Sequence, residues 1–561
     1  MSATGNNPYG MKFIPGRTEL YRQQGYWGDA TLLDAWSYSV RRHPDKYAVI
    51  DSQGGALSFR AADAEASRVA RVLLDVGVKR GDIVSLQLPG WVEFLPIYIG
   101  CMKAGAAVNP IPPNLRYQEL LHILSTCESK VLLAPCFFRK YYYDGMLARL
   151  CKKVKSLHTA IIVRKGGDER PEACVLSLDE LLEDASPLSR AEVAGCQEGL
   201  TGSSLAAVMF TSGSEGEPKG VMLTHDNILS SEESFAAHLN ISQFDTMLMP
   251  APITHATGFH HGIIMPFMVG ATTVLQDVFC PEDSLKLIEK YRCTVSMASP
   301  PFLYDMLRVL ANRQFNLSSL RYFLCGGAPV DPIMMERALA AGINTSVVYG
   351  STESVPHVAC KYSDILARRG DVGGLGMPGI EVKSIDRDGN AVGCGEEGQE
   401  LSRGPQVTIG YMKQPELTAK ALDDEGWFYS GDLCLSDSEG LITITGRLKD
   451  MIIRGGENIS SLEVENILLR HPDIREVAVV GMPDPRLTER ACAYVVLEDG
   501  AKRMSLEEMV EFLNGQDISK FKFPERLELL KEFPRTASGK IRKGILRKEI
   551  SLKIEAEARQ S

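Results

Sequence analysis

Two short segments, far apart in the chain, most constrain how it can fold: 211–220 (TSGSEGEPKG) and 534–540 (PRTASGK). The first combines glycines, hydroxyl residues and one lysine, a composition that lets backbone N–H groups converge on an anion. It lacks the spacing of a Walker loop. The second ends on Lys540 and is suited to deliver a mobile lysine. If both segments bind one phosphate-bearing molecule, the fold must bring the two ends of the chain together.

Length and composition narrow the class of protein. At 561 residues the chain is too long for one domain. Its 44% hydrophobic and 24% charged residues are typical of a globular protein, and a net charge of −10 argues against nucleic-acid binding. The thirteen cysteines form no C-x-x-C pair, which favours free thiols in a reducing cytosol.

The chain shows no sign of secretion or of a membrane span. Its first residues lack the basic start and apolar stretch of a secretory signal. The most apolar early run, 94–112, contains Lys103 and several glycines and prolines, so it does not read as a membrane helix. We therefore expect a cytoplasmic protein, and peripheral membrane contact is left open.

Helical and strand-like patterns alternate from about residue 31 to residue 446. Apolar residues recur at helical spacing in 61–76, 91–103, 117–125 and 285–291. Short apolar runs lie near them, at 83–88, 106–111, 131–134 and 294–298. This alternation predicts an α/β domain with layered, mostly parallel sheets flanked by helices. The polar segment 166–203 is interpreted as a surface connection.

The pattern changes near residues 446–450. Residues 460–463 (SSLE) read as the capped start of a helix that runs to Arg470 and stops before Pro472. Strand-like runs follow at 477–480 and 492–497, and 505–508 (SLEE) predicts a second capped helix ending at Gly515. We expect an N-terminal domain over 1–446, a short linker at 447–449 and a small α+β domain over 450–561.

Three further motifs lie between the two opening segments. Together with 211–220 and 534–540, the set includes 349–353 (YGSTE), 429–433 (YSGDL) and 446–450 (GRLKD). In this order they resemble the adenylate-forming superfamily of acyl-CoA synthetases, peptide-synthetase adenylation domains and firefly luciferase. The strings YRQQGYWGDA, PITHATGFHHG, FLCGGAP and RGGENISSLEVE narrow the resemblance to bacterial short- and medium-chain fatty acyl-CoA ligases. Neighbouring subfamilies activate cyclic or aromatic acids.

The resemblance implies an activity and its substrates. A carboxylic acid would attack the α-phosphate of ATP, giving an acyl-adenylate and pyrophosphate, and coenzyme A would then take the acyl group. Catalysis of such a step is mainly positioning and charge neutralisation. ATP, coenzyme A and a small carboxylic acid are thus the expected partners, with Mg²⁺ as the metal and a monomer or homodimer as the assembly.

The resemblance also assigns roles to residues of this chain. The catalytic set would be Lys540, Glu353, His255 and Lys219. Glu353 would bind Mg²⁺, which prefers oxygen ligands, with Thr211 beside it. The phosphates would lie against Thr211, Ser212, Gly213, Ser214, Gly216 and Lys219. The adenine would contact Gly326, Gly327, Ala328, Pro329, Tyr349, Gly350, Ser351 and Thr352, and the ribose would bind Asp432 and Arg447.

Two positions need separate comment. Glu215 stands where many relatives have threonine, and beside phosphates its charge would cost up to ~1 kcal/mol if solvated, so we expect it to point outward. His255 matches a position beside the acyl carboxylate. His260 and His261 follow closely, but with no Cys, Asp or Glu at ligand spacing the three histidines do not indicate zinc. Residues around Phe259, Gly262 and Met297 are candidates for the acyl pocket or for ordinary core packing.

The second half-reaction implies a change of arrangement. In the family, the C-terminal domain rotates about the hinge, here Lys449, so that Lys540 leaves and a tunnel for the thiol opens. Gly455 and Gly456 would border that tunnel and allow the thiol arm to approach closely. Two other readings remain: an adenylation enzyme that loads a carrier protein, and a catalytically silent nucleotide-binding protein on the same fold.

Overall fold

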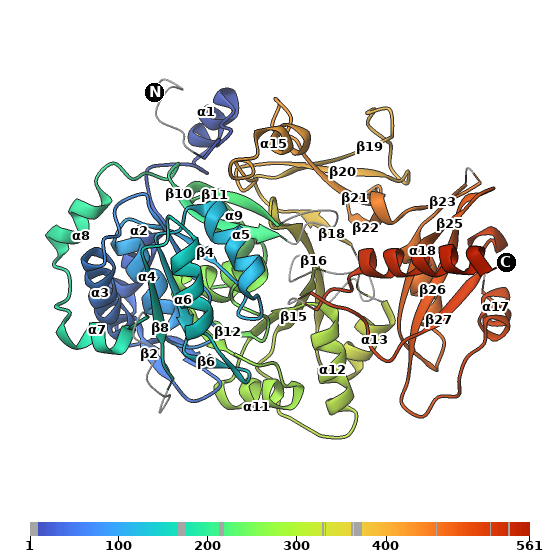
Figure 1. Ribbon diagram of the computed structural model, residues 1–561, viewed down its shortest axis with the longest axis horizontal. Helices are drawn as coiled ribbons and strands as arrows, with labels where there is room; N and C mark the ends of the chain where they lie inside the picture. The colour runs from blue at the N-terminus through green and yellow to red at the C-terminus, as the bar shows by residue number, and fades with distance from the viewer. Residues whose placement is uncertain are drawn as a thin grey trace.

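The computed structural model describes residues 9–165, 175–211, 218–327, 330, 332–360, 363, 373–455, 457–516, 518–536 and 539–560, and the side chains of 332 and 558–560 are outside this description. The chain forms a large α/β N-terminal domain, followed by a smaller C-terminal domain (Figure 1). The predicted fold class is therefore confirmed.

A seven-stranded sheet occupies one side of the N-terminal domain, counted over the described residues, with the order β11-β10-β4-β3-β5-β8-β9. Its neighbours are parallel except for the antiparallel β10–β11 hairpin. The strands are β3 (Ile83–Leu86), β4 (Ala107–Pro110), β5 (Val131–Pro135), β8 (Thr159–Val163), β9 (Leu176–Ser177), β10 (Leu205–Thr211) and β11 (Lys219–Thr224).

Successive residues of these strands enter two different cores. Leu133 faces the main core with α3 (Phe59–Asp75) and α4 (Phe94–Lys103), whereas its neighbour Leu132 faces a smaller core with α5 (Tyr117–Cys127) and α6 (Asp144–Lys153). Side chains alternate along a strand, so a sheet covered on both faces needs continuous apolar runs. This is why the runs at 83–88 and 131–134 were recognisable in the sequence as strands.

A larger sheet runs through the rest of the domain. Over the described residues it has thirteen strands in the order β19-β20-β21-β22-β18-β17-β16-β15-β14-β12-β13-β1-β2. From β1 to β16 the inner strands pair in parallel, whereas all pairs from β16 to β19 are antiparallel. The expectation of mostly parallel sheets thus describes only one half of this sheet.

The parallel half consists of β1 (Tyr47–Asp51), β12 (Thr246–Met249), β13 (Thr272–Leu275), β14 (Val295–Ala298), β15 (Tyr322–Gly326) and β16 (Thr345–Ser351), with β2 (Ala56–Ser58) antiparallel at its edge. The antiparallel half consists of β17 (Val355–Ala359), β18 (Gly373–Gly376), β19 (Glu381–Ile385), β20 (Gly398–Arg403), β21 (Phe428–Ser436) and β22 (Ile442–Arg447).

Helices complete the N-terminal domain. They include α1 (Pro15–Gln23), α2 (Leu32–Arg42), α7 (Leu178–Asp184), α8 (Arg190–Gln197), α9 (His225–His238), the π-helix η1 (Thr257–Ile264), α10 (Met265–Val269), α11 (Pro281–Tyr291), α12 (Pro300–Leu310), α13 (Pro332–Ala340) and α15 (Pro415–Ala421). Two short strands, β6 (Phe137–Phe138) and β7 (Tyr141–Tyr142), form a separate hairpin. The polar segment taken as a surface connection contains α7 and α8.

The C-terminal domain has its own sheet and cores. The strands are β23 (Ile452–Arg454), β24 (Glu457–Ile459), β25 (Ile474–Asp484), β26 (Thr488–Leu497) and β27 (Arg526–Leu529), and they follow the short helix η2 (Leu448–Asp450). The helices are α16 (Ser461–Leu468), α17 (Leu506–Asn514), the short η3 (Lys520–Lys522) and α18 (Lys543–Gln560). The predicted caps are present, since the hydroxyls of Ser460 and Ser505 accept from the N–H groups of Glu463 and Glu508.

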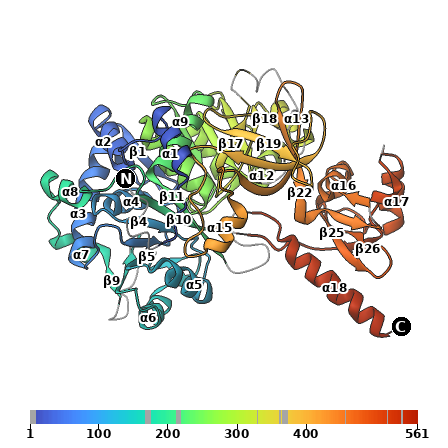
Figure 2. The ribbon, with the colours of Figure 1, turned by 90° about the horizontal axis from the view of Figure 1, so that it is seen from above.

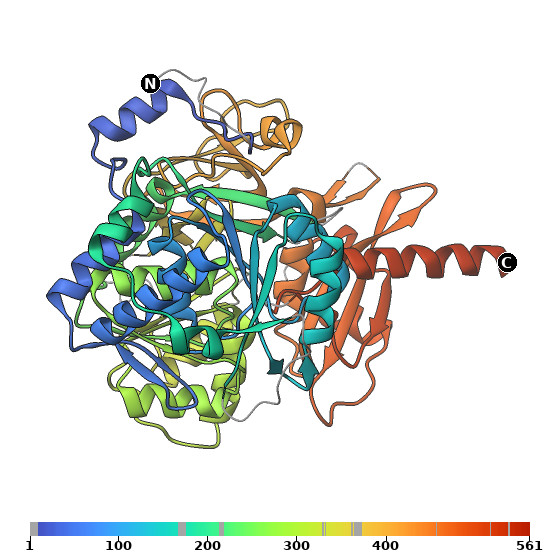
Figure 3. The same ribbon diagram turned by 60° about the vertical axis from the view of Figure 1, so that its left-hand side comes forward.

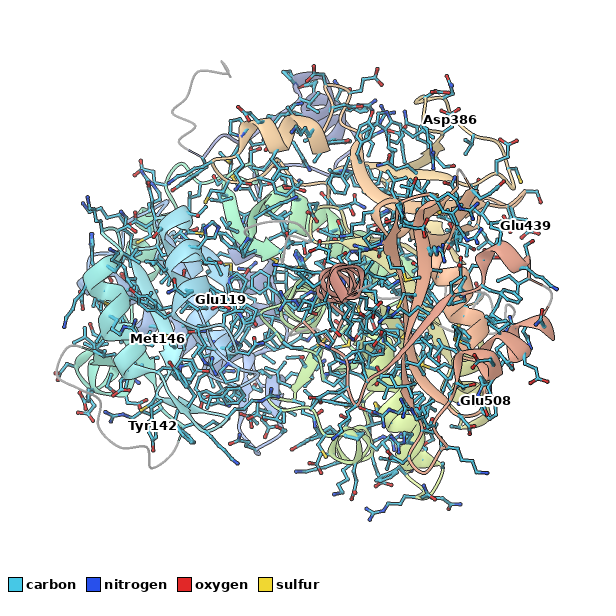
Figure 4. The ribbon with its side chains drawn as sticks, turned by 45° about the vertical axis from the view of Figure 1, so that its right-hand side comes forward. Glu119, Tyr142, Met146, Asp386, Glu439 and Glu508 are labelled. Carbon is cyan, nitrogen blue, oxygen red and sulfur yellow. The ribbon has the colours of Figure 1, made fainter. Side chains whose placement is uncertain are left out.

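The last helix projects from the body of the molecule. α18 starts near the junction of the domains, packs on β25 and extends outward to the C-terminus (Figures 2 and 3). Asp386 and Glu439 mark the turns of the β19–β20 and β21–β22 hairpins at the outer edge of the molecule in Figure 4. β22 ends at Arg447, and η2 directly after it leads into the C-terminal domain.

Two sequence expectations concern the whole chain. None of the cysteines in the described part of the chain forms a disulfide bond. Of the described helices, none has both the length and the apolar composition needed to span a bilayer.

Candidate active site

A cavity of about 1580 Å³ lies between the two domains. Its lining includes Gly327, Tyr349, Asp432 and Arg447 from the N-terminal domain and Lys540 from the C-terminal domain. The motifs at 349–353, 429–433, 446–450 and 534–540 therefore meet here, whereas no described residue of 211–220 lines this cavity.

Lys540 is presented by a tight hairpin of the C-terminal domain. The Thr536 N–H donates to the Lys540 carbonyl at 2.8 Å, the Lys540 N–H donates to Thr536 Oγ1 at 3.1 Å, and Gly539 takes a φ of +85° at the turn. A positive φ of this size favours glycine. The side chain reaches the N-terminal domain, where its Cε lies 3.5 Å from the place a Cβ on Gly327 would occupy.

The charge state of Lys540 follows from its surroundings. Burial and then the charge of Arg447 lower the pKa of Lys540 from 10.5 to about 8, although Asp432 and Glu353 oppose the shift. The nearby His255 is affected in the same sense: burial, then the charge of Lys540, lower the pKa of His255 to about 3. At neutral pH the site therefore pairs a charged lysine with a neutral imidazole.

Tyr411, which no sequence motif marks, contacts both Glu353 and Lys219. The Tyr411 hydroxyl donates to Glu353 Oε1 at 2.9 Å, and Lys219 Nζ lies 5.2 Å from the centroid of the Tyr411 ring. Lys219 pairs across the β10–β11 hairpin with Thr211. Burial and then Glu353 raise the pKa of Tyr411, so its hydroxyl is a donor at any physiological pH.

The turn that carries Glu353 is tightly constrained. Ser351 Oγ accepts from the N–H groups of Glu353 and Ser354, at 3.1 and 3.2 Å. Val355, fully buried, has a φ of +51°, which is strained for a β-branched residue. A Cβ on Gly350 would lie 2.3 Å from the Val355 carbonyl oxygen, so this position accepts only glycine without a shift of the backbone.

Asp432 is held from two sides in the middle of β21. Its Oδ1 lies 3.1 Å from Arg447 Nε, its cross-strand neighbour on β22, and its Oδ2 accepts from the Tyr349 hydroxyl at 3.0 Å. Burial raises the pKa of Asp432, while Arg447 and the hydrogen bond from Tyr349 lower it. The site thus keeps an anchored carboxylate next to a guanidinium.

The predicted site residues divide into three groups. Gly327, Tyr349, Gly350, Asp432, Arg447 and Lys540 line the cavity. Gly326, Ser351, Thr352 and Glu353 adjoin these residues along the chain, His255 lies near Lys540, and Lys219, with Thr211 across the hairpin, is linked to Glu353 through Tyr411. Those outside the described residues are Ser212, Gly213, Ser214, Glu215, Gly216, Ala328, Pro329 and Gly456. Gly455 is placed apart, at the β23–β24 turn with a φ of +60° and its N–H bonded to the Leu487 carbonyl.

The neighbouring histidines meet a carboxylate that the sequence search for metal ligands overlooked. Glu232 on α9 lies 2.9 Å from Nδ1 of His261 and 3.6 Å from Nδ1 of His260, and all three side chains are fully buried. Burial alone would raise the pKa of Glu232, but His261 and His260 bring it down to about 2. Within the described residues no three ligands gather as a metal site.

Two further residues near the cavity also escaped the sequence analysis. Glu400 on β20 and His357 on β17 form a fully buried pair beside Tyr349. They belong to strands well separated in sequence from each other, and no motif marks them. Phe259 and Met297, candidates for the acyl pocket, lie in the main core, where Phe259 packs on Tyr98 with ring centroids 5.2 Å apart.

Comparison with known proteins defines the class to which this fold and site belong. The family model for AMP-binding enzymes matches residues 36–412, and the model for the AMP-binding enzyme C-terminal domain matches 463–540. The chain belongs to the AMP-binding enzyme family, as the sequence resemblance predicted.

Individual relatives extend over nearly the whole chain. A medium-chain fatty-acid–CoA ligase of Escherichia coli (strain K12) is 45% identical over 97% of this chain and 94% of its own length. A feruloyl-CoA synthase of an Amycolatopsis species is 31% identical over 92% of this chain and 98% of its own. The crystal structure of ATP-bound MatB from Rhodopseudomonas palustris superposes with a TM-score of 0.83, at 27% identity, covering 93% of this chain and 99% of that one.

Proposed function

We propose that this protein is an ATP-dependent acid–CoA ligase that activates a medium-chain fatty acid as an acyl-adenylate and then transfers the acyl group to coenzyme A. The observation that carries the proposal is the position of Lys540. A lysine from the C-terminal domain is buried at Gly327, near His255, Asp432 and Glu353 of the N-terminal domain. The 45% identity to a medium-chain fatty-acid–CoA ligase supports the choice of substrate class.

In the first half-reaction a carboxylate oxygen attacks the α-phosphorus of ATP. A new bond joins the acyl oxygen to phosphorus, the bond to the β-phosphate breaks, and pyrophosphate leaves. The charge that gathers on the reacting oxygens is stabilised by a cation fixed in a dry site. Lys540 supplies this cation, and the neutral His255 beside it borders the acyl carboxylate.

The nucleotide binds across the described residues of the N-terminal domain. Tyr349 and Gly327 contact the adenine, Asp432 and Arg447 bind the ribose hydroxyls, and Lys219 with Thr211 contacts the phosphates. The residues present fit Mg²⁺, because Glu353 offers carboxylate oxygens oriented by Tyr411 at the side where Lys219 lies. When bound, the ion neutralises phosphate charge.

The second half-reaction requires Lys540 to leave. The thiolate of coenzyme A attacks the acyl carbonyl carbon, a thioester forms, and AMP departs with the electron pair of the broken C–O bond. We propose that the C-terminal domain rotates about residues 447–449 and brings Gly455 and Gly456 to the thiol path. The division into 1–446 and 450–561 is supported by the change of sheet between β22 and β23.

A second acid class deserves testing because of one comparison. The relative named as a feruloyl-CoA synthase aligns over 92% of this chain, so an aromatic acid is the alternative substrate. Free thiols among the described cysteines support a cytoplasmic location, and we keep a monomer or homodimer and peripheral membrane contact as proposals.

Pyrophosphate release with acids of graded length tests the proposal. The enzyme, ATP and Mg²⁺ are mixed with short- to long-chain fatty acids or ferulate, with and without coenzyme A. Turnover that depends on coenzyme A and is greatest at medium chain length supports the assignment. A maximum with ferulate establishes the aromatic alternative, and turnover independent of coenzyme A favours loading of a carrier protein.

A further inference from the structure

Glu400 and His357 form a buried pair directly behind the nucleotide motifs. Neither side chain is exposed, and His357 Nε2 lies 3.2 Å from Glu400 Oε1. Both ring nitrogens of His357 are engaged, since Nδ1 lies 3.0 Å from the Val355 carbonyl oxygen. Burying polar groups of this kind lowers the stability of the fold unless they are hydrogen-bonded, so a buried pair such as this one is expected to serve a purpose.

The number of protons in the pair follows from its geometry. A backbone carbonyl can only accept, so His357 Nδ1 carries a proton. A hydrogen bond between Nε2 and Glu400 then requires one more proton, either on the ring or on the carboxyl. Both assignments leave the pair with no net charge, which makes its burial tolerable.

Glu400 connects the pair to the ribose side of the site. The Tyr349 hydroxyl lies 3.1 Å from Glu400 Oε2 and 3.0 Å from Asp432 Oδ2. Burial, with Glu400 and Asp432, raises the pKa of Tyr349 well above its usual value, so the hydroxyl keeps its proton. His357 bonds to Oε1 of Glu400, whereas the Tyr349 hydroxyl faces Oε2, so the Tyr349 oxygen is held between Glu400 and Asp432.

An irregularity in the pairing of β20 with β21 places Glu400 beside Tyr349. The pairing of β20 with β21 shifts register between Gln399 and Leu401, at the position of Glu400. Such bulges re-aim side chains and occur next to active sites. Ser430 reinforces the link, since its hydroxyl donates to the Glu400 carbonyl at 2.7 Å and accepts from the Asp432 N–H at 3.0 Å.

His357 connects the pair to the Glu353 side of the site. The carbonyl that it binds belongs to Val355, the strained residue that follows the Glu353 turn. Strained backbone persists only where its surroundings hold it. His357 is therefore placed to keep this turn in its observed conformation.

We propose that Glu400 and His357 are positioning residues of the nucleotide site, fixing Asp432 through the Tyr349 hydroxyl and the Glu353 turn through the Val355 carbonyl. This inference rests on the proposed function, in which Asp432 binds the ribose. Its consequence is that the pair, which touches no substrate, sets how strongly the site prefers ATP to nucleotides that lack a ribose hydroxyl.

The test compares ATP with 2′-deoxy-ATP and 3′-deoxy-ATP. For each nucleotide, kcat/KM for pyrophosphate release with octanoate and the Kd without acid are measured in the wild type and in Glu400→Gln, His357→Phe and Tyr349→Phe. The preference for ATP should fall about tenfold in each variant, the effect typical of losing a hydrogen bond to a charged group. Tyr349→Phe combined with Glu400→Gln should fall no further than either alone, because both break one chain of contacts.

Glu232→Gln is the matched control. It removes a carboxyl charge from a second fully buried carboxylate–histidine pair, in which Glu232 lies 2.9 Å from His261 on α9 and η1 rather than beside Tyr349. This variant should lose stability without losing the preference for ATP. An unchanged preference in Glu400→Gln, or an equal loss in Glu232→Gln, overturns the positioning role.

Two features keep the result interpretable. Tyr349→Phe deletes one oxygen atom, so it tests the link to Asp432 even if Glu400→Gln fails to fold. The wild type could bind ATP more tightly than the deoxynucleotides and yet release no pyrophosphate with any acid. That result would contradict the proposed function but not the positioning role. Wild-type turnover with an unchanged preference in all three variants contradicts the positioning role alone.

Discussion

The two halves of the active site are held in different ways. On the N-terminal domain, the side chains of Asp432 and Glu353 are fixed by buried hydroxyls of Tyr349 and Tyr411. On the C-terminal domain, Lys540 is set by the backbone of its hairpin and enters the site from across the domain junction. The groups proposed to bind AMP in both half-reactions are thus anchored, whereas the lysine proposed to act in only one of them is supplied by the other domain.

The largest effect should come from removing Lys540, the cation that the C-terminal domain supplies to the site. Lys540→Ala should slow acyl-adenylate formation by about 10²–10³, the usual loss when one stabilising group at the reacting oxygens is deleted. Conversion of supplied acyl-AMP to acyl-CoA should change little, because the proposed rotation of the C-terminal domain takes Lys540 out of the site for that step. Rapid-quench measurements give the rate of each half-reaction separately. Equal losses in both rates would show that Lys540 does not act in adenylate formation alone.

The next largest effect should be a dependence of adenylate formation on pH, caused by loss of the proton of Lys540. With a pKa lowered to about 8, Lys540 is charged below that pH and neutral above it. Adenylate formation should therefore fall about tenfold per pH unit above pH 8, while thioester formation from supplied acyl-AMP keeps its rate apart from ionisation of the thiol. Lys540→Arg provides the control, since a guanidinium stays charged and should abolish this fall.

The carboxylate of Glu353 can be deprived of its hydrogen bond from Tyr411 while Glu353 itself is kept. Tyr411→Phe deletes the hydroxyl that orients Glu353 Oε1. The apparent Kd for Mg²⁺ in adenylate formation should rise about fivefold, as expected for one hydrogen bond to a charged group that water partly replaces. Magnesium titrations at fixed ATP check this, with Tyr304→Phe as a variant that lacks a hydroxyl elsewhere. A Tyr411→Phe enzyme with the wild-type Mg²⁺ dependence would show that Glu353 needs no such anchor.

The smallest effect concerns the contact between the domains. The Tyr304 hydroxyl on α12 donates to Glu498 Oε1 at 2.7 Å across the junction. Tyr304→Phe should slow adenylate formation about two- to fivefold by weakening the arrangement that brings in Lys540, since a partly exposed bond of this kind contributes only about 1 kcal/mol. Single-turnover assays should show no loss in thioester formation. A loss confined to that second step would mean that this contact belongs to the other arrangement.

The residues of the candidate site that lie within continuous motifs could be named from the sequence. Tyr349, Glu353, Asp432 and Arg447 each belong to a recognisable string, and Lys540 ends another. Helices such as α17 were predictable because a serine–glutamate capping box and a terminal glycine mark both ends. Strands β3, β4, β5 and β14 were predictable because they are short, mostly apolar runs that are buried throughout.

The supporting residues could not be predicted in the same way. Glu400, His357 and Tyr411 reach the site only because the antiparallel half of the large sheet places β20, β17 and the segment after β20 together. Glu232 pairs with His261 although one is on α9 and the other on η1. Such pairs depend on tertiary packing and leave no spacing in the sequence. The helices α7 and α8 were missed because their short, polar sequences lack a clear apolar period.

The two-step reaction itself can be tested most directly in the wild-type enzyme. The enzyme is mixed in excess with labelled octanoate, ATP and Mg²⁺ without coenzyme A, and the quenched products are separated. We predict acyl-adenylate and pyrophosphate in equal amounts, followed on addition of coenzyme A by acyl-CoA and AMP. The appearance of ADP and phosphate, or the absence of pyrophosphate until coenzyme A is present, would contradict this account.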